Sequence, residues 1–233
     1  LKENAGEVDL LYADVLISVT SFFRNPEAFA ALKTKVFPKL LRPDRGSDVV
    51  RVWTLGCSSG QEAYSIAMAY TEFCDKIPRA PKLQIFGMDL NEALLEKARR
   101  GLYTPCQVAG LAPERLRRFF VEEQGGYRVV KALRELCVFA RQNILSDPPF
   151  SRMDLISCRN LLIYIELELQ KRILPNFHYA LKPGGFLFLG ASESIGAAAN
   201  LFEPVDKKQR IFQKKAGAIS TYRLPVSPSP ALR

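Results

Sequence analysis

The sequence predicts an α/β fold with a mostly parallel, doubly wound sheet and a small inserted α/β subdomain. Two segments each read as a strand, a turn and a helix, at residues 49–70 and 83–101. A helical segment separates two further apolar runs, at 153–158 and 186–190. Such alternation is typical of a parallel sheet covered on both faces. In these sheets ligands bind beyond the carboxyl ends of the strands.

The composition is that of an ordinary globular protein, with 233 residues of which 48% are hydrophobic and 24% charged. No run approaches the ~18 uninterrupted apolar residues of a membrane-spanning helix, so no membrane insertion is expected. The chain does not start with Met and is interpreted as a piece of a longer polypeptide.

The net charge of +9 comes from 33 Lys and Arg against 24 Asp and Glu. Much of the excess lies near the end of the chain, without the interleaved aromatic residues of a nucleic-acid stacking platform. It therefore favours a solvated edge strand over a nucleic-acid groove. These basic residues are Lys207, Lys208, Arg210, Lys214 and Lys215.

The five cysteines form no C-x-x-C pair, and His178 is the only histidine. We therefore expect no metal site and no disulfide framework, and a reducing, cytoplasmic location. His178 falls within a predicted helix and is interpreted as a helix-surface or packing residue. The cysteines are Cys57, Cys74, Cys106, Cys137 and Cys158.

The first part of the chain predicts a helical entry followed by two βα units. Residues 7–19 have roughly helical spacing, and Asn25 is predicted to cap a helix that starts at Pro26 and runs to about Leu41. Val49–Gly56 is a β-rich run that ends in a glycine turn before the helical segment from Gln61. A second strand, 83–89, ends in Asp89 and precedes a helix capped by Asn91 and closed by Gly101.

Residues 103–136 interrupt the alternation and predict the inserted subdomain. It contains a short helix at 113–120, a turn at 124–127 and a strand at 128–130. The main pattern then resumes, and the last residues, rich in proline, predict a flexible tail. The resumed elements are strands at 138–140 and 153–158, a helix at about 166–181, a turn at 182–185, a strand at 186–190 and two short strands within 202–215.

The turn Gly-Cys-Ser-Ser-Gly at 56–60 lacks the lysine of a P-loop and is not G-x-G-x-x-G. Gly56 allows the backbone to approach a ligand closely. Asp89, at the end of the next strand, suits the two hydroxyls of a ribose. A nucleoside ligand without phosphates, S-adenosylmethionine, fits this pair best, while another nucleotide-type ligand remains the plainer alternative.

Four blocks resemble the CheR family of chemotaxis receptor methyltransferases, in the form found in fused CheB/CheR-type signalling proteins. The family esterifies glutamate side chains with S-adenosylmethionine on a Rossmann-like class I methyltransferase fold. The resemblance covers about residues 10–215, in order. The blocks are Thr-Ser-Phe-Phe-Arg at 20–24, Leu-Gly-Cys-Ser-Ser-Gly-Gln-Glu-Ala-Tyr-Ser at 55–65, Cys-Arg-Asn-Leu-Leu-Ile-Tyr at 158–164 and Leu-Lys-Pro-Gly-Gly at 181–185.

The resemblance implies a role for each matching residue. Arg24 with Thr20 binds the methionyl carboxylate, Glu62 the α-ammonium and Asp89 the ribose. Ser18 stands where well-known members carry Asn, so this donor contact is expected to differ. Alone, each residue reads equally well as a helix cap, a surface charge or a core side chain. The remaining implied residues are Asn143 and Ile144 beside the adenine, and Arg159, Asn160 and Tyr164 on the methyl-transfer side, with Arg159 and Tyr164 as the catalytic pair.

The resemblance also implies the domain organisation and the partners. Residues 1–45 end a helical N-terminal domain and linker, 46–215 form the methyltransferase domain with 103–136 inserted, and 216–233 are the tail. The partner is the cytoplasmic region of a chemoreceptor or other signalling protein, without nucleic acid. The turn at 123–127 is short, so we expect no tether to a receptor C-terminal peptide.

Three other functions are weighed against this one. A nucleic-acid amino-methyltransferase is suggested by Asp-Pro-Pro-Phe at 147–150, but the motif precedes a strand instead of ending one. A non-catalytic module that binds the donor or its product is a second alternative. A small-molecule O-methyltransferase is a third alternative. Such enzymes often use a metal or a histidine base, and this sequence predicts neither at the site.

Overall fold

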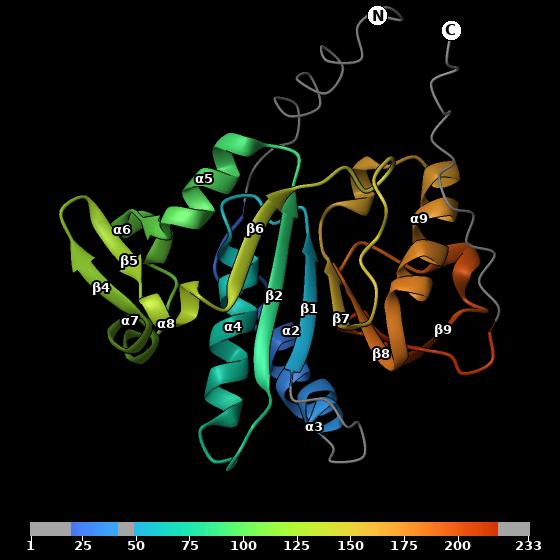
Figure 1. Ribbon diagram of the computed structural model, residues 1–233, viewed down its shortest axis with the longest axis horizontal. Coiled ribbons are helices and arrows are strands. Elements are labelled where there is room, and N and C mark those ends of the chain that lie inside the picture. Colours follow the sequence, from blue (N-terminus) through green and yellow to red (C-terminus); the bar gives the residue numbers. More distant parts are fainter. Residues whose placement is uncertain (1–19, 42–48, 219–233) are drawn as a thin grey trace, which may run out of the picture.

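The computed structural model describes residues 20–41 and 49–218. A seven-stranded sheet with the order β6-β2-β1-β7-β8-β10-β9 forms its centre (Figure 1). The five strands from β6 to β8 are parallel, and β10 runs antiparallel to β8 and β9. The predicted doubly wound α/β fold is therefore confirmed. The strands are β1 (Val49–Leu55), β2 (Lys82–Asp89), β6 (Cys137–Arg141), β7 (Met153–Cys158), β8 (Leu181–Leu189), β9 (Phe202–Asp206) and β10 (Ile211–Lys214).

Helices cover both faces of the sheet, and each face has its own apolar core. Residues of β1 divide between the two cores, with Val50 and Val52 in one and Trp53 and Leu55 in the other, as the period of two in a strand requires. The first core lies under α2 (Pro26–Ala31), α4 (Gln61–Cys74) and α5 (Glu92–Arg100), and the second under α9 (Leu167–Ala180).

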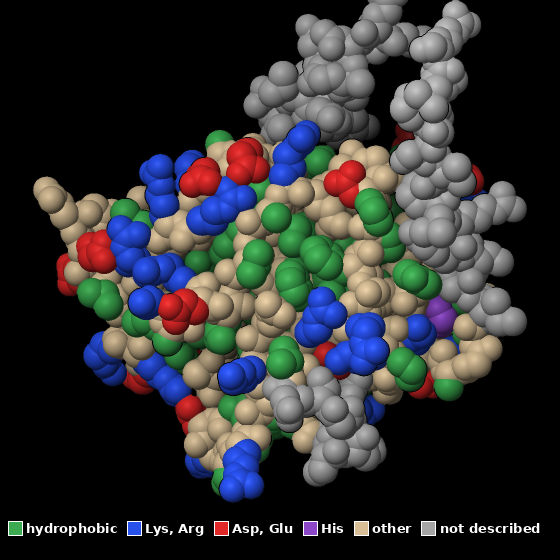
Figure 2. Space-filling model, viewed as in Figure 1, with side chains coloured by type: hydrophobic (Ala, Val, Ile, Leu, Met, Phe, Trp, Pro, Cys, Tyr) green, Lys and Arg blue, Asp and Glu red, His purple; other side chains and the backbone are tan. Residues whose placement is uncertain are grey.

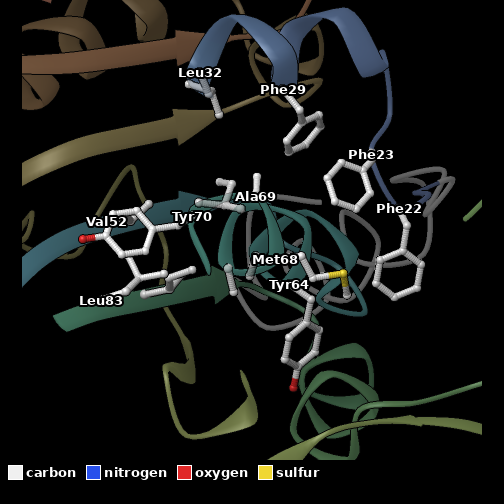
Figure 3. Packing of buried hydrophobic residues seen from close by; sticks show 14 of the residues in the cluster. Phe22, Phe23, Phe29, Leu32, Val52, Tyr64, Met68, Ala69, Tyr70 and Leu83 are labelled. Carbon is white, nitrogen blue, oxygen red and sulfur yellow. The ribbon is translucent and has the colours of Figure 1, made fainter. Parts of the chain in front are cut away.

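The first core joins the start of the described chain to the sheet. Figure 3 shows Phe29 and Leu32 lying above α4, with Phe23 beside Phe29 and with Phe22 and Tyr64 lower in the view. All five side chains are at most 7% exposed. Burial of a large apolar side chain stabilises a fold by about 1.5–3 kcal/mol. This packing fixes residues 20–32 against the sheet edge where the predicted site motifs lie.

The helix predicted from Pro26 to Leu41 is divided into three segments. After α2 the chain widens into a π-helical turn, η1 (Leu32–Val36), and then continues as α3 (Phe37–Leu40). Pro38 has no amide hydrogen to donate to Thr34 and its ring crowds that carbonyl, which accounts for the wider turn. Asn25 occupies the N-cap position before Pro26, as predicted, and its carbonyl accepts from the Ala28 amide at 2.9 Å. With φ of 61°, its side chain makes no cap hydrogen bond.

The βα units at 49–101 are confirmed. Asn91 accepts a hydrogen bond from the Leu94 amide at 3.1 Å, and Gly101 closes α5 in the left-handed conformation. The turn predicted at 182–185 belongs to β8, which starts at Leu181 opposite Met153 and bulges before Phe186.

Residues 102–134 form a second, three-stranded sheet with the order β3-β5-β4 and three short helices. The sequence predicted the helix and one strand, but not β3 and β4. Glu123 pairs with Gly126, so a two-residue turn links β4 and β5. The elements are β3 (Leu102–Tyr103), α6 (Pro105–Val108), α7 (Pro113–Phe119), β4 (Phe120–Glu123), β5 (Gly126–Val129) and α8 (Lys131–Arg134).

The loop 142–152 replaces a helix over one face of β2 and β6. Its Phe150 stacks on Phe86, with ring centroids 5.0 Å apart, and meets Trp53 edge-on at 5.4 Å. Hydrophobic side chains remain visible over β2 and β6 in Figure 2, and Val138 is 46% exposed. Within residues 20–41 and 49–218, no helix has the length and apolar composition to cross a bilayer.

Candidate functional site

The register of the sheet brings three predicted motifs to one edge. Leu55, the last residue of β1, lies opposite Met88 of β2 and Cys158 of β7. The residues that follow, Asp89 at the end of β2 and Arg159 after β7, therefore lie on either side of the glycine turn. Because these strands are parallel, their carboxyl ends share the edge where ligands bind in such folds.

The glycine turn of 56–60 wraps around the Asp89 carboxylate. The Ser58 amide donates to Asp89 Oδ2 at 2.7 Å, and the Asn91 amide donates to Oδ1 at 3.0 Å. Gly56 has φ of +61° and Gly60 of +90°, conformations that favour glycine. An ionised carboxylate has about four acceptor sites, so two remain for the hydroxyls of a ribose. The fixed carboxylate fits the predicted ligand.

Glu62, in the first turn of α4, is the centre of a buried polar network. Its Oε1 accepts from the Ser157 hydroxyl and its Oε2 from Arg159 Nη1, both at 2.8 Å. The Glu62 side chain is 15% exposed and that of Arg159 is 3% exposed. Such a fixed carboxylate at the sheet edge fits an ammonium group.

Arg159 also holds the chain that precedes α2. Its Nη2 donates to the Arg24 carbonyl at 2.8 Å and to Asn25 Oδ1 at 3.1 Å. The guanidinium lies 4.6 Å from the ring centroid of Phe188 and 5.3 Å from that of Phe29. Arg159 thus links the start of the described chain to Glu62, and sequence reasoning did not predict this link.

Thr20 and Arg24 are half-buried at the start of the described chain, while Ser18 lies outside the described residues. Tyr164 lies on a short 3-10 turn, η3 (Leu162–Tyr164), and is 45% exposed. Asn160 has φ of +60°, a left-handed conformation that asparagine tolerates. The structure therefore brings Glu62 and Arg159 into contact, but it leaves Tyr164 open to solvent.

The loop after β6 contains the two residues predicted to edge the adenine. The Leu145 amide donates to Asn143 Oδ1 at 2.9 Å, and the Asn143 amide donates to Asp147 Oδ2 at 2.8 Å. Ile144 packs against the second core. Asp147 and Phe150, the two ends of the Asp-Pro-Pro-Phe motif, thus hold the loop and cover the sheet.

A cavity of about 310 Å³ opens beside Arg159, between the start of α2, the end of β8 and the β9–β10 turn. Lys208 is exposed on its rim, as is Glu27. The lining residues are Asn25, Glu27, Ala28, Arg159, Leu189, Ala191, Lys208 and Gln209.

The thiols near the site are inert. Burial, and then the Asp89 charge, raise the pKa of Cys57. Burial, followed by the Glu193 charge, raises the pKa of Cys158. Both side chains are at most 1% exposed, so they are protonated packing groups. The described residues contain no group of three His, Cys, Asp or Glu that could hold a metal ion.

Three contributors were missed by the sequence reasoning: Ser157, Asn25 and the Ser58 amide. Ser157 had a signal, because a hydroxyl that follows the apolar residues Leu155 and Ile156 in a buried strand, and is 1% exposed in the structure, needs a buried partner. Asn25 was interpreted only as a helix cap, and the backbone amide has no signal in the sequence.

Comparison with known proteins gives a consistent result. Residues 18–211 match the family described as "CheR methyltransferase, SAM binding domain". Chemotaxis protein methyltransferase 1 of Pseudomonas aeruginosa is 39% identical over 208 residues, 87% of this chain and 76% of that protein. The chemotaxis protein methyltransferase of Listeria monocytogenes is 36% identical over 195 residues, 84% of this chain and 72% of that protein.

A third relative is much longer than this chain. An uncharacterized 104.1 kDa protein of Rhodobacter capsulatus is 41% identical over 213 residues, and the match spans 91% of this chain but 22% of that protein. Among solved structures, PKMT2 from Rickettsia typhi in complex with AdoHcy has a TM-score of 0.43 and 19% identity. The match covers 73% of this chain and 26% of that one, a likeness too weak to support an inference.

Proposed function

The chain belongs to the CheR methyltransferase family, and we propose that it methylates glutamate side-chain carboxylates of a chemoreceptor or related signalling protein. The single observation that carries this proposal is the cavity at Arg159. It lies at the carboxyl ends of β7 and β8, beside the Glu62 network, and carries Lys208 on its rim. Arg159 is paired with Glu62, and Glu27 also lines this opening, so the exposed Lys208 is the cation that suits an anionic side chain there.

We assign the donor contacts residue by residue. Glu62 takes the α-ammonium, Arg24 with Thr20 the methionyl carboxylate, and Asp89 the ribose. Asn143 and Ile144 edge the adenine, and Ser18 would add a contact from outside the described residues. Support comes from the two acceptor sites left on Asp89 and from the fixed orientation of Glu62.

S-adenosylmethionine supplies a methyl group already activated by its sulfonium. A glutamate carboxyl has an ordinary pKa of about 4.3, so it is ionised near neutrality and needs no strong base. Arg159 and its neighbour Asn160 orient that carboxylate, and Tyr164 hydrogen-bonds beside the transferring methyl group. The chain therefore contributes alignment and exclusion of water.

We infer the partner and location from the same features. The two-residue β4–β5 turn is too short for a glycine-rich loop that docks a receptor C-terminal peptide, so recognition proceeds without that tether. Five free cysteines fit the reducing cytoplasm in which receptor methylation regions lie. We also infer that residues 46–215 form the methyltransferase domain, with 103–136 inserted, after a helical domain that ends at 45.

The test is a labelling experiment with methyl-labelled S-adenosylmethionine, receptor-bearing membranes and DNA, followed by mild base. Volatile labelled methanol from the protein fraction is expected, because esters hydrolyse and N-methyl groups do not. Asp89→Asn should abolish the label, whereas Glu168→Gln, at a side chain that is 79% exposed on α9, should retain it. Base-stable label on DNA would contradict the proposal, and product binding without any label would favour a non-catalytic module.

A further inference from the structure

Glu193 is a buried carboxylate that takes no part in the proposed donor contacts. It follows β8, on the loop that leads to the short turn η4 (Gly196–Ala198), and it is 3% exposed. A buried charge is costly unless hydrogen bonds surround it. Its partners therefore indicate what the group is for.

Three backbone amides at the site edge donate to this carboxylate. The Leu161 and Leu162 amides donate to Oε1 at 2.9 and 2.7 Å. The Gly190 amide donates to Oε2 at 2.6 Å. Glu193 thus fastens the loop after β7 to the end of β8 by charge-assisted hydrogen bonds.

Gly190 allows the two loops to approach this closely. A Cβ atom there would lie 2.7 Å from Glu193 Oε2 and 2.9 Å from the Asn160 backbone nitrogen. Both distances are below those of real Cβ contacts. Asn160 adopts a left-handed conformation at this contact, with φ of +60°, and it directly precedes the two amides that donate to Glu193 Oε1.

Two anchors therefore act on one loop. Arg159, its first residue, is held by Glu62 and by the segment before α2. Two of the following residues, Leu161 and Leu162, which lie between Asn160 and Tyr164, are held by Glu193. Loss of the second anchor should leave the first in place.

We propose that Glu193 is a positioning residue that sets Asn160 and Tyr164 relative to the donor site. This inference rests on the proposed function, because it assigns to Glu193 the alignment of the methyl-transfer side. The isosteric Glu193→Gln variant keeps one acceptor oxygen and presents an amide donor to an N–H group. Methyl transfer should therefore slow while donor binding, carried by Glu62 and Asp89, remains.

Two variants and a matched control test this split. Glu193→Gln and Gly190→Ala should lower kcat at least tenfold, with donor KM and product Kd within threefold of the wild type. Asp154→Asn is the control, because Asp154 is also 3% exposed and lies at the opposite end of β7. It accepts from the Arg51 amide at 2.9 Å and from Lys182 at 2.8 Å, and its kcat should stay within twofold.

Amide hydrogen exchange gives a readout that does not depend on activity. In Glu193→Gln the Leu161 and Leu162 amides should exchange at least tenfold faster, whereas Asp154→Asn should change the Arg51 amide instead. Wild-type kcat in Glu193→Gln, or an equal loss in Asp154→Asn, would overturn the proposal. If the wild type transfers no methyl group, the proposed function fails. Unchanged exchange of the Leu161 and Leu162 amides in Glu193→Gln would separately refute the role of Glu193 as an anchor of the loop after β7.

Discussion

Glu62→Gln separates the observed role of one carboxylate from its proposed role. Glu62 is the counter-ion of Arg159, and it is the group to which we assign the donor ammonium. Glutamine keeps the shape and removes the charge. Its carbonyl oxygen can still accept from Arg159, and its amide can donate to the Ser157 hydroxyl, which also accepts hydrogen bonds.

The expected loss of stability follows from burial. Breaking a buried ion pair costs about 3–5 kcal/mol, because the remaining charge stays uncompensated. The Arg159 side chain is 3% exposed, but Glu62 is 15% exposed and glutamine keeps part of the hydrogen bonding. We therefore expect a loss of about 2–3 kcal/mol. With a urea slope of about 2.5 kcal/mol/M, the midpoint should fall by about 1 M.

Product binding measures the second role. Removing a charged hydrogen-bonding partner costs about 1.5–3 kcal/mol, which weakens S-adenosylhomocysteine about tenfold or more. Urea unfolding and titration calorimetry on the same preparation supply both numbers. Glu92→Gln is the matched control, since Glu92 also lies in a first helical turn but is 55% exposed beside Arg99. It should lose at most about 1 kcal/mol.

Either result can fail separately. A lower midpoint with product affinity within twofold of the wild type would refute the ammonium assignment. Weaker binding with an unchanged midpoint would refute the argument from the buried pair. A loss in Glu92→Gln as large as that in Glu62→Gln would mean that the helix dipole, not the pair, dominates.

The remaining predictions concern pH, backbone geometry and the acceptor. Burial, and then the charge of Lys214, lower the pKa of His178, the only histidine. As the pH decreases, the unfolded chain therefore binds this proton before the folded chain does, and the urea midpoint should decrease once the pH is below about 6.5. His178→Gln should remove this dependence of the midpoint on pH. Gly126→Ala should cost at least about 3 kcal/mol in thermal unfolding, because φ is +146° and its Cβ would lie 2.1 Å from the Tyr103 carbonyl oxygen. Lys208→Glu should raise KM for the protein acceptor severalfold while calorimetric product affinity stays unchanged; an unchanged KM would argue against the cavity as the acceptor site.

The sequence predicted the elements whose local signals agree with their packing. The glycine turn at 56–60 and the capped helix at 91–101 combine turn chemistry with apolar periodicity, and both are present. The strand β4 was missed because three of its four residues are exposed and it has little apolar pattern. The strand β3 has only two residues.

The sequence predicted where the site residues lie in the fold better than it predicted which side chains contact each other. The motifs predicted that Glu62 and Arg159 lie at one edge, but their contact depends on the register of β1 against β7, since the two residues are 97 positions apart in the chain. Asn25 shows the same limit. Its place before Pro26 indicates a cap, yet the left-handed backbone turns its side chain toward Arg159.

Three buried polar groups lie together where β7 and β8 end. Ser157, Arg159 and Glu193 are all buried, and all lie at or beyond the carboxyl ends of β7 and β8. Stability alone does not explain this, since well-packed apolar residues in place of a buried ion pair are often as stable or more so. What a network of fixed charges does provide is a single orientation for each carboxylate and loop. Methyl transfer requires such a fixed orientation, because the reaction depends on alignment of the reacting groups more than on a strong acid or base.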